Sequence, residues 1–288
     1  MLYGAIEAGG TKFVVAVGEE NGKIIKRESF PTEKPEITME KVYAFFENYR
    51  AELVAIGIGS FGPIDIRKKS DTYGYITQTP KLAWRNYDFV GNMKAKFDVP
   101  IGFTTDVNAA ALGEVKLGAA ADVESCIYLT VGTGIGGGAV VNGKILEGYS
   151  HPEMGHILIG NEKEDTFEGT CPSHKNCLEG LAAGSAIEAR WGKKGVDLSE
   201  DKAVWDLEAS YLAKALLDYT LILSPERIVL GGGVMKQRQL FPLIREKIVT
   251  LNNDYIELPD LESYIVPPKL EDNAGITGCV LLAVEASK

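Results

Sequence analysis

Two cysteines and two histidines with the spacing of a metal site lie in the middle of the chain. Cys171, His174 and Cys177 recur at every third position, and His156 lies 15 residues before Cys171. Two thiolates and two imidazoles form a complete tetrahedral ligand set for zinc, with no open position for a reacting water. A polar loop with ordinary thiols is the simpler alternative, but two of the four cysteines and two of the three histidines fall in this window. We therefore predict a structural zinc site.

Two glutamates bracket these ligands. Glu153 opens the segment Glu153–His156, and Glu179 follows Cys177 by two positions. Carboxylates accept hydrogen bonds from hydroxyl groups, so we predict that both glutamates bind a polar substrate. His156 has two ring nitrogens, and one can bind zinc while the other faces the same substrate. The metal would hold this pocket in shape and take no part in the reaction.

Glycine-rich turns suited to phosphate binding occur twice. The first, Ala8–Lys12, lies between two strand-like runs, and the second, Gly132–Gly138, follows the strand-like run Ile127–Val131. Adjacent glycines let backbone N–H groups approach an anion closely. Each turn is followed by another strand and an Asn-Gly turn, and Asn142–Ile145 has the same four residue types as Asn21–Ile24. This self-similarity predicts a duplicated fold.

Asp106 stands between the two turns, where the strand-like run 101–104 gives way to a predicted helix. Aspartate is a preferred helix cap, so a structural role is the simpler interpretation. The anion-suited turns on either side of it in the sequence favour a role at a phosphate-transfer site instead. A third glycine cluster, Gly231–Gly233, follows the strand-like run 227–230 and allows backbone contact with a flat or charged ligand.

Helices and strands alternate along the rest of the chain. Hydrophobic periodicity predicts helices over 38–49, 89–97, 181–191, 203–223, 237–251 and 274–286, and strands over 53–58, 101–104 and 227–230. No linker or low-complexity segment interrupts them, so we expect a compact boundary between two domains near 114–121.

The composition is that of a globular protein large enough for two domains. The 288 residues are 45% hydrophobic and 24% charged. A net charge of −10 argues against a nucleic-acid partner. No apolar run approaches the length of a membrane span, and no secretory signal pattern is present. We therefore expect a cytoplasmic protein with Cys126 and Cys279 as reduced thiols in its core.

Together these motifs resemble the ROK family of sugar kinases, within the actin-like ATPase superfamily, over essentially the whole chain. Ala8–Lys12 is similar to the first phosphate motif, and Thr130–Gly138 to the second. Gly231–Gly233 resembles the adenosine motif, and Gly275–Cys279 the second connecting segment.

The most specific likeness is to the family's sugar-and-zinc signature, which combines Glu153–His156 with Cys171, His174, Cys177 and Glu179. The opening Ala8–Lys12 and the segment Gly59–Asp65 look most like the fructokinase branch of the family.

The resemblance implies an α/β fold in which an actin-like (ribonuclease H-like) ATPase unit is duplicated, giving two lobes with a cleft between them. We expect an N-terminal lobe over 1–116, joined by the C-terminal helix 274–288. The C-terminal lobe would cover 117–273 and include a zinc-stabilised substrate loop at 150–180. The resemblance also implies a homodimer.

The implied activity is ATP-dependent phosphorylation of D-fructose to fructose 6-phosphate, with Asp106 as the general base. The alternatives are a glucokinase, mannokinase or N-acetylhexosamine kinase, a non-catalytic sugar-binding regulator, and an actin-like ATPase that works on protein partners. The expected sugar contacts are Glu153, His156, Glu179 and Thr105. The expected contacts of ATP, with Mg²⁺, are Gly9, Gly10, Thr11, Lys12, Thr133, Gly134, Gly231, Gly232 and Gly233. The expected ligands of structural Zn²⁺ are His156, Cys171, His174 and Cys177.

Three positions depart from the family's usual pattern. Glu7 stands where the superfamily usually has an aspartate that orients the Mg²⁺ shell. Thr105 replaces an asparagine that is common just before the catalytic aspartate, and its shorter side chain would leave more room near the attacking hydroxyl. His174 occupies a position that is often cysteine and remains a competent zinc ligand.

Overall fold

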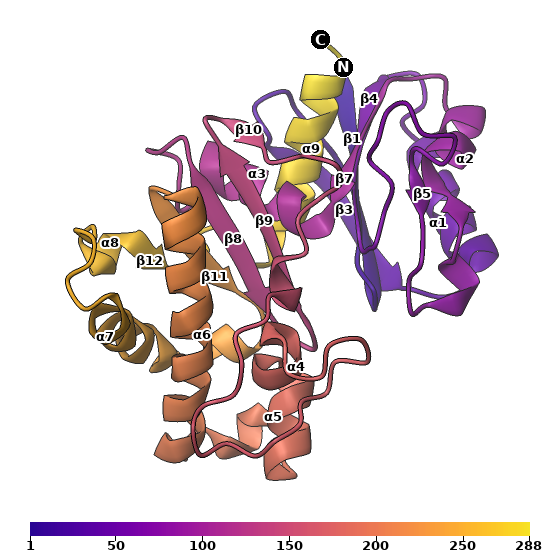
Figure 1. Cartoon of the computed structure of the whole chain (residues 1–288). Helices are drawn as coiled ribbons and strands as arrows, with labels where there is room; N and C mark the ends of the chain where they lie inside the picture. The colour runs from indigo at the N-terminus through magenta and orange to yellow at the C-terminus, as the bar shows by residue number, and fades with distance from the viewer.

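Two five-stranded sheets with the same internal order form the centre of the computed structural model, which describes all residues from 1 to 288 (Figure 1). The first sheet has the order β3-β2-β1-β4-β7 and consists of β1 (Leu2–Ala8), β2 (Lys12–Gly18), β3 (Ile24–Pro31), β4 (Leu53–Ser60) and β7 (Ile101–Thr105). The second has the order β10-β9-β8-β11-β12 and consists of β8 (Cys126–Val131), β9 (Ile135–Val141), β10 (Lys144–Ile145), β11 (Arg227–Gly231) and β12 (Ile265–Val266). In each sheet an antiparallel meander is followed by two parallel strands. The predicted duplication is confirmed.

The strands of the first sheet differ in sequence because they differ in burial. β1 and β2 are nearly continuous apolar runs, since helices cover both faces of the sheet there. β3 is an edge strand and exposes Lys26, Arg27 and Glu28. Charged side chains on an exposed edge discourage pairing with a strand of another molecule.

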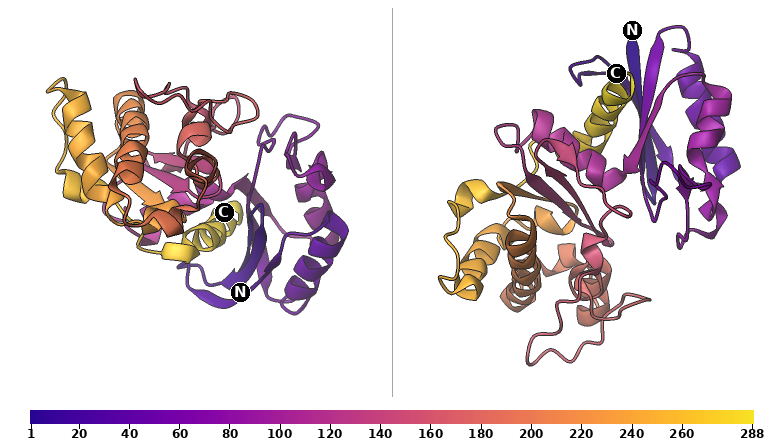
Figure 2. Two further views of the ribbon diagram at one scale, coloured as in Figure 1. Left: turned by 90° about the horizontal axis from the view of Figure 1, so that it is seen from below. Right: turned by 45° about the horizontal axis from the view of Figure 1, so that its top comes forward.

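Helices cover both sheets in layers. α1 (Pro35–Glu47) and α2 (Phe89–Lys96) pack on the outer face of the first sheet, and α6 (Lys202–Leu223) and α7 (Leu240–Asn252) on the outer face of the second. Between the sheets, α9 (Ala274–Ala286) packs on the first sheet and α3 (Asp106–Leu117) on the second, and the two helices contact each other (Figure 2).

The contact between α3 and α9 depends on glycine. A Cβ atom on Gly278 would lie 1.7 Å from the carbonyl oxygen of Ala109, and one on Gly113 would lie 2.4 Å from that of Ala274. No other residue type permits such an approach, so these two helices form a tightly packed centre between the sheets. Asp106, the first residue of α3, is held at this centre.

The remaining elements are short. They are β5 (Tyr75–Ile76), β6 (Tyr87–Asp88), α4 (Leu178–Ala182), α5 (Gly184–Trp191), α8 (Leu261–Tyr264) and the 3-10 helices η1 (Leu82–Trp84), η2 (Met154–His156), η3 (Gly195–Leu198), η4 (Val234–Lys236) and η5 (Glu271–Asn273). No helix combines the length and apolar composition that a membrane span requires. The division of the chain at residues 116 and 117 stays a prediction.

Two predicted helices differ from the structure. The segment 181–191 is not one helix: Ala183, with ψ at 159°, separates α4 from α5. The N–H of the next residue, Gly184, donates to the carbonyl oxygen of Gly132 at 2.7 Å, and this contact with the second glycine turn replaces a bond within the helix. The helix predicted from residue 237 begins at Leu240, because η4 occupies the residues after the glycine cluster.

Candidate active site

A cleft of about 570 Å³ opens between the two sheets. Its lining includes Glu7 from the end of β1, Lys12 from the first glycine turn and Asp106 from the start of α3. Gly231–Gly233 at the end of β11 and Thr130 near the end of β8 line the opposite side. Carboxyl ends of parallel strands are the usual ligand-binding edge of an α/β sheet.

Asp106 does not cap its helix. The N-cap is Thr105, whose hydroxyl oxygen accepts the N–H of Asn108 at 3.1 Å. Oδ1 of Asp106 accepts the adjacent N–H of Val107 at 2.9 Å, and the side chain is partly exposed to the cleft. The capping interpretation of Asp106 is therefore wrong, and its carboxylate is available to a ligand.

The environment of Asp106 makes it a stronger base than an ordinary aspartate. Burial raises the pKa of its carboxyl to about 6, and the nearby charge of Glu153 acts in the same direction. The Val107 hydrogen bond and His151 oppose the increase in this pKa. A carboxylate with a pKa near 6 is suited to accept a proton at neutral pH.

Glu7 is a second carboxylate in the cleft with a raised pKa. Its Oε2 is buried without a hydrogen-bond partner, and burial, assisted by the charge of Asp106, raises the pKa of Glu7 to about 7. A Cβ atom on Gly275 at the start of α9 would lie 2.6 Å from its Cδ, so this glycine makes room for the carboxylate. The sequence shows the residue type at position 7, but the burial comes from α9, which is more than 260 residues away in the chain.

Glycine occupies the positions of these clusters for different structural reasons. A Cβ atom on Gly9 would lie 2.7 Å from the Lys12 carbonyl oxygen, and Gly232 has a φ of 91° that favours glycine. Nothing lies within 4 Å of the Cβ position of Gly233, which leaves that backbone open to the cleft. Lys236, shortly after this cluster, adds positive charge to the cleft.

Some predicted ATP contacts line this cleft and others do not. Lys12 and Gly231–Gly233 do. The others lie outside its lining, in the turns that precede β2 and β9: Gly9, Gly10, Thr11, Thr133 and Gly134. Lys236 and Arg238, which we did not predict, line it as well, and the available signal was their place within five positions of a glycine cluster.

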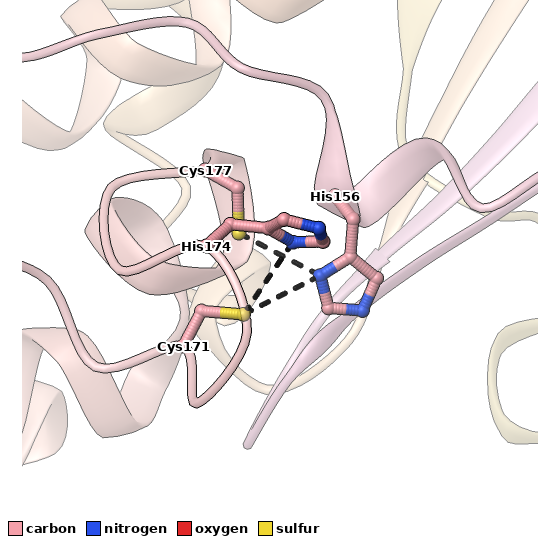
Figure 3. A group of neighbouring side chains, drawn as sticks. All are labelled: His156, Cys171, His174 and Cys177. Atoms are coloured by element: carbon pink, nitrogen blue, oxygen red, sulfur yellow. Dashed lines mark hydrogen bonds between the residues drawn. The ribbon is translucent and has the colours of Figure 1, made fainter. Parts of the chain in front are cut away.

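The four predicted metal ligands come together in one group (Figure 3). Their ligand atoms all lie within 4.8 Å of one another. Nδ1 of His156 is 3.7 Å from Sγ of Cys171 and 3.6 Å from Sγ of Cys177, and Nδ1 of His174 is 3.8 Å from Sγ of Cys171. With Zn–S bonds of about 2.3 Å and Zn–N bonds of about 2.0–2.1 Å, neighbouring corners of a tetrahedron lie about 3.5 Å apart. The donor set and spacing therefore fit zinc.

Among the predicted sugar residues, Glu179 connects this group to the strand after the second glycine turn. Nε2 of His156 is 3.9 Å from Oε1 of Glu179, and Oε2 of Glu179 accepts the N–H of Ile135 at 2.9 Å. The side chain of Glu153 is 51% exposed, and its charge acts on Asp106. Thr105 is 5% exposed, with its hydroxyl turned to the helix, and a sugar contact there stays a prediction.

Comparison with known proteins decides the family, because the family model described as ROK family matches residues 3–286. The chain belongs to the ROK family. A fructokinase of Streptococcus mutans is 50% identical to this ROK protein, over 96% of this chain and 94% of the relative. A fructokinase of Pediococcus pentosaceus is 49% identical, over 100% of this chain and 99% of the relative. The crystal structure of a ROK hexokinase from Thermus thermophilus has a TM-score of 0.81 and 28% identity, with 98% of each chain covered. The predicted family and the duplicated, actin-like fold class are confirmed.

Proposed function

We propose that this ROK protein is an ATP-dependent kinase that transfers a phosphoryl group to the 6-hydroxyl of D-fructose, giving fructose 6-phosphate. The observation that carries the proposal is the position of Asp106, free of any capping role, in a cleft that also contains Lys12 and Gly231–Gly233. The relatives named fructokinase, at 50% and 49% identity over nearly the whole chain, support fructose as the sugar.

ATP would occupy the cleft, with its adenosine against Gly231–Gly233 and its phosphates near Lys12. The open backbone at Gly233 and the positive charges of Lys236 and Arg238 suit a nucleotide. Mg²⁺ bound to the phosphates supplies charge neutralisation for phosphoryl transfer. Glu7 would orient the hydrated ion, and its unpartnered buried Oε2 fits that role.

Asp106 would accept the proton of the attacking 6-hydroxyl. Phosphoryl transfer depends mainly on positioning and charge stabilisation, and a base within hydrogen-bond reach orients the nucleophile and receives its proton. Because burial raises the pKa of Asp106 to about 6, the group is ionised at neutral pH and still basic enough to take the proton.

The sugar would bind beside Asp106, against Glu153, His156 and Glu179. These side chains present two carboxylates and a ring nitrogen, which match the hydroxyls of a hexose. A sugar that lacks one of these hydroxyls would leave a polar group unpaired, so the pocket would discriminate strongly.

Zinc would be structural. His156, Cys171, His174 and Cys177 would hold it in a closed tetrahedral set, which leaves no position for a reacting molecule. The metal would cross-link the long loop after η2 to the start of α4 and thereby fix the face of His156 that meets the sugar. We also propose a cytoplasmic location, because none of the four cysteines forms a disulfide, as is typical of a reducing compartment. The homodimer stays a prediction.

A coupled assay of ADP release tests the proposal, with fructose, mannose, glucose and N-acetylglucosamine compared at one MgATP concentration. We expect sugar-stimulated release with the highest kcat/KM for fructose. Preference for another sugar would contradict fructose as the substrate but would still support a sugar kinase. Rapid release without sugar would indicate an ATPase that acts on other partners. Sugar binding without any release would indicate a regulator.

A further inference from the structure

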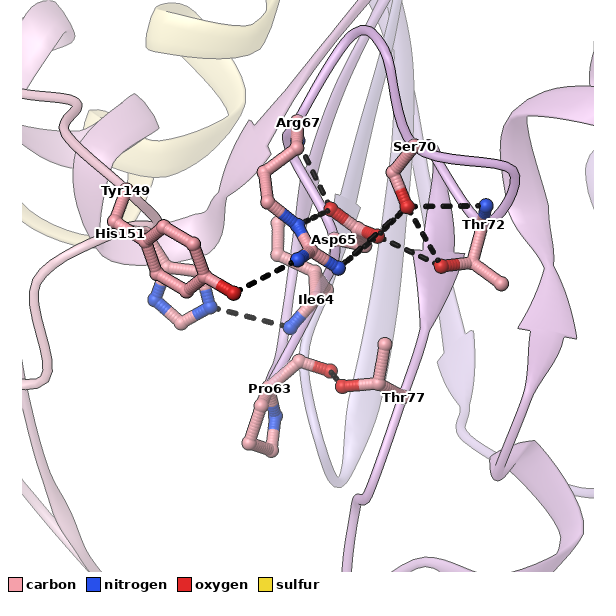
Figure 4. A network of polar contacts seen from close by, with 9 residues as sticks. All are labelled: Pro63, Ile64, Asp65, Arg67, Ser70, Thr72, Thr77, Tyr149 and His151. Carbon is pink, nitrogen blue, oxygen red and sulfur yellow. Dashed lines mark hydrogen bonds and ion pairs between the residues drawn. The ribbon is translucent and has the colours of Figure 1, made fainter.

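His151 is the one histidine outside the metal group, and its ring lies beside Ile64 in the segment after β4 (Figure 4). Its side chain is 4% exposed, although it belongs to an irregular loop. Its ring packs near Gly62, where a Cβ atom would lie 3.7 Å from its Cε1. A polar ring buried to this degree requires partners for both nitrogens.

The first partner fixes the proton of the ring. The backbone N–H of Ile64 donates to Nε2 of His151 at 3.2 Å. A ring nitrogen that accepts a hydrogen bond carries a lone pair, so in the neutral ring the proton resides on Nδ1. The contact joins a loop after β4 to the loop before η2, across 87 positions of the chain.

The second nitrogen faces Glu153, one of the proposed sugar contacts. Nδ1 of His151 lies 3.6 Å from Oε1 of Glu153 and 3.3 Å from the carbonyl oxygen of Pro152. A proton on Nδ1 therefore faces two acceptors, and one of them is the carboxylate that lies near Asp106.

The loop that contacts His151 is held by a network of hydrogen bonds. Asp65 accepts hydrogen bonds from the side chains of Arg67, Ser70 and Thr72, and its carboxyl is 2% exposed. Arg67 also donates to the hydroxyl of Tyr149 at 3.1 Å and lies over its ring, two residues before His151. Figure 4 shows both contacts between the segments. The Ile64 N–H that donates to His151 therefore lies next to a residue, Asp65, with several hydrogen bonds.

We propose that His151 is a positioning residue for the sugar site: held by Ile64 as the Nδ1–H tautomer, it orients Glu153 so that this carboxylate faces the sugar beside Asp106. The inference rests on the proposed function, since the orientation of Glu153 matters only if this carboxylate binds the sugar. It predicts that substitution of His151 weakens binding of the sugar and does not change binding of the nucleotide.

Two substitutions separate the two contacts. In His151→Gln the amide can accept the Ile64 N–H from the Nε2 position, but no donor remains toward Glu153. In His151→Asn the amide lies near the Nδ1 position and can donate to Glu153, but it does not reach Ile64. His151→Ala lacks both contacts. Thr77→Val is the matched control, because it removes a 3.0 Å hydrogen bond to the Pro63 carbonyl oxygen in the same loop, away from Glu153.

The test combines steady-state kinetics with nitrogen-15 NMR of the unmodified protein. We expect the KM for fructose to rise about 10-fold or more in His151→Ala, because the Glu153 carboxylate then loses the polar ring nitrogen that faces it at 3.6 Å. The KM for MgATP should not change. The rise should be smaller in His151→Asn than in His151→Gln, and Thr77→Val should behave as the unsubstituted enzyme. The spectrum should show one histidine protonated at Nδ1.

Several results would overturn this assignment. They are an Nε2–H tautomer for His151, a KM for fructose in His151→Ala within twofold of the unsubstituted enzyme, or equal increases in the KM values for fructose and MgATP. If the unsubstituted enzyme prefers another hexose, the fructose proposal fails, and the same ratios measured with that hexose still test His151. The NMR result does not depend on activity at all.

Discussion

Replacement of Asp106 by asparagine should greatly reduce activity while leaving the fold intact. The Asn side chain keeps the shape of Asp and can still accept the Val107 N–H, which Asp106 accepts at 2.9 Å. It cannot take a proton. Since the helix cap is Thr105, the substitution leaves the N-terminus of α3 capped. Removal of a general base reduces the rate by about 10²–10⁴, or about 2.7–5.5 kcal/mol of barrier.

The same substitution should make the folded state more stable at pH 8. Burial raises the pKa of Asp106 from its ordinary value of 3.8 to about 6. The contribution of this group to stability is therefore complete below pH 3.8 and lost as the pH rises to about 6. Above that pH the native state carries a disfavoured charge, which asparagine removes. The pKa difference sets an upper limit of about 3 kcal/mol, and exposure to cleft water reduces the expected gain to about 1–2 kcal/mol.

Two measurements on one pair of proteins check this account. kcat with saturating fructose and MgATP should fall by about 10²–10⁴, and urea unfolding at pH 8 should give a higher free energy of unfolding for Asp106→Asn. Thr105→Ala is the control, because it should lose about 1 kcal/mol of stability through its cap. If Asp106→Asn retained more than about a tenth of the turnover, or if it were destabilised like Thr105→Ala, the assignment of Asp106 as the base would be refuted.

Three further predictions follow from the same structure. Metal analysis should find about one zinc per chain, and Cys171→Ser should lose both the metal and most fructose binding; full activity after exhaustive chelation would contradict a structural role. With saturating MgATP, kcat/KM for fructose should fall as the pH decreases through about 6, because Asp106 becomes protonated; a flat profile between pH 5 and pH 8 would argue against it. Glu208 is buried with both carboxyl oxygens unpartnered, and burial raises its pKa well above the ordinary 4.5, so its contribution to stability is lost as the pH rises above 4.5. Glu208→Gln should therefore be more stable than the unsubstituted protein at pH 8, with a smaller difference at pH 4; lower stability at pH 8 would mean that the carboxylate is paired.

Local sequence was sufficient for the turns and for the metal group. The Asn-Gly pair at 142–143 has φ values of 51° and 73°. Asparagine and glycine adopt such positive φ values more easily than most other residue types. The equivalent pair at 21–22 uses a positive φ only at Gly22, so the two hairpins share a position but not a turn type. The four predicted metal ligands lie within 22 positions of one another, and short loops bring such residues together in many folds.

Contacts between distant segments could not be predicted. The helix break at Ala183 depends on the Gly132 carbonyl oxygen, which lies more than 50 positions earlier. The high pKa of Glu7 depends on burial beneath α9. No sequence motif includes His151, and its partner, the Ile64 N–H, lies 87 positions earlier in the chain. In each case the residue type was known, but the partner was set by tertiary packing.

The position of the phosphate on the product tests the central claim most directly. Purified protein should be incubated with D-fructose and MgATP, and the product examined by phosphorus-31 NMR together with the amount of ADP formed. We predict fructose 6-phosphate, with one ADP for each phosphate transferred. Phosphate on the 1-oxygen of fructose, or no phosphorylated fructose while another hexose is converted rapidly, would contradict the proposed function.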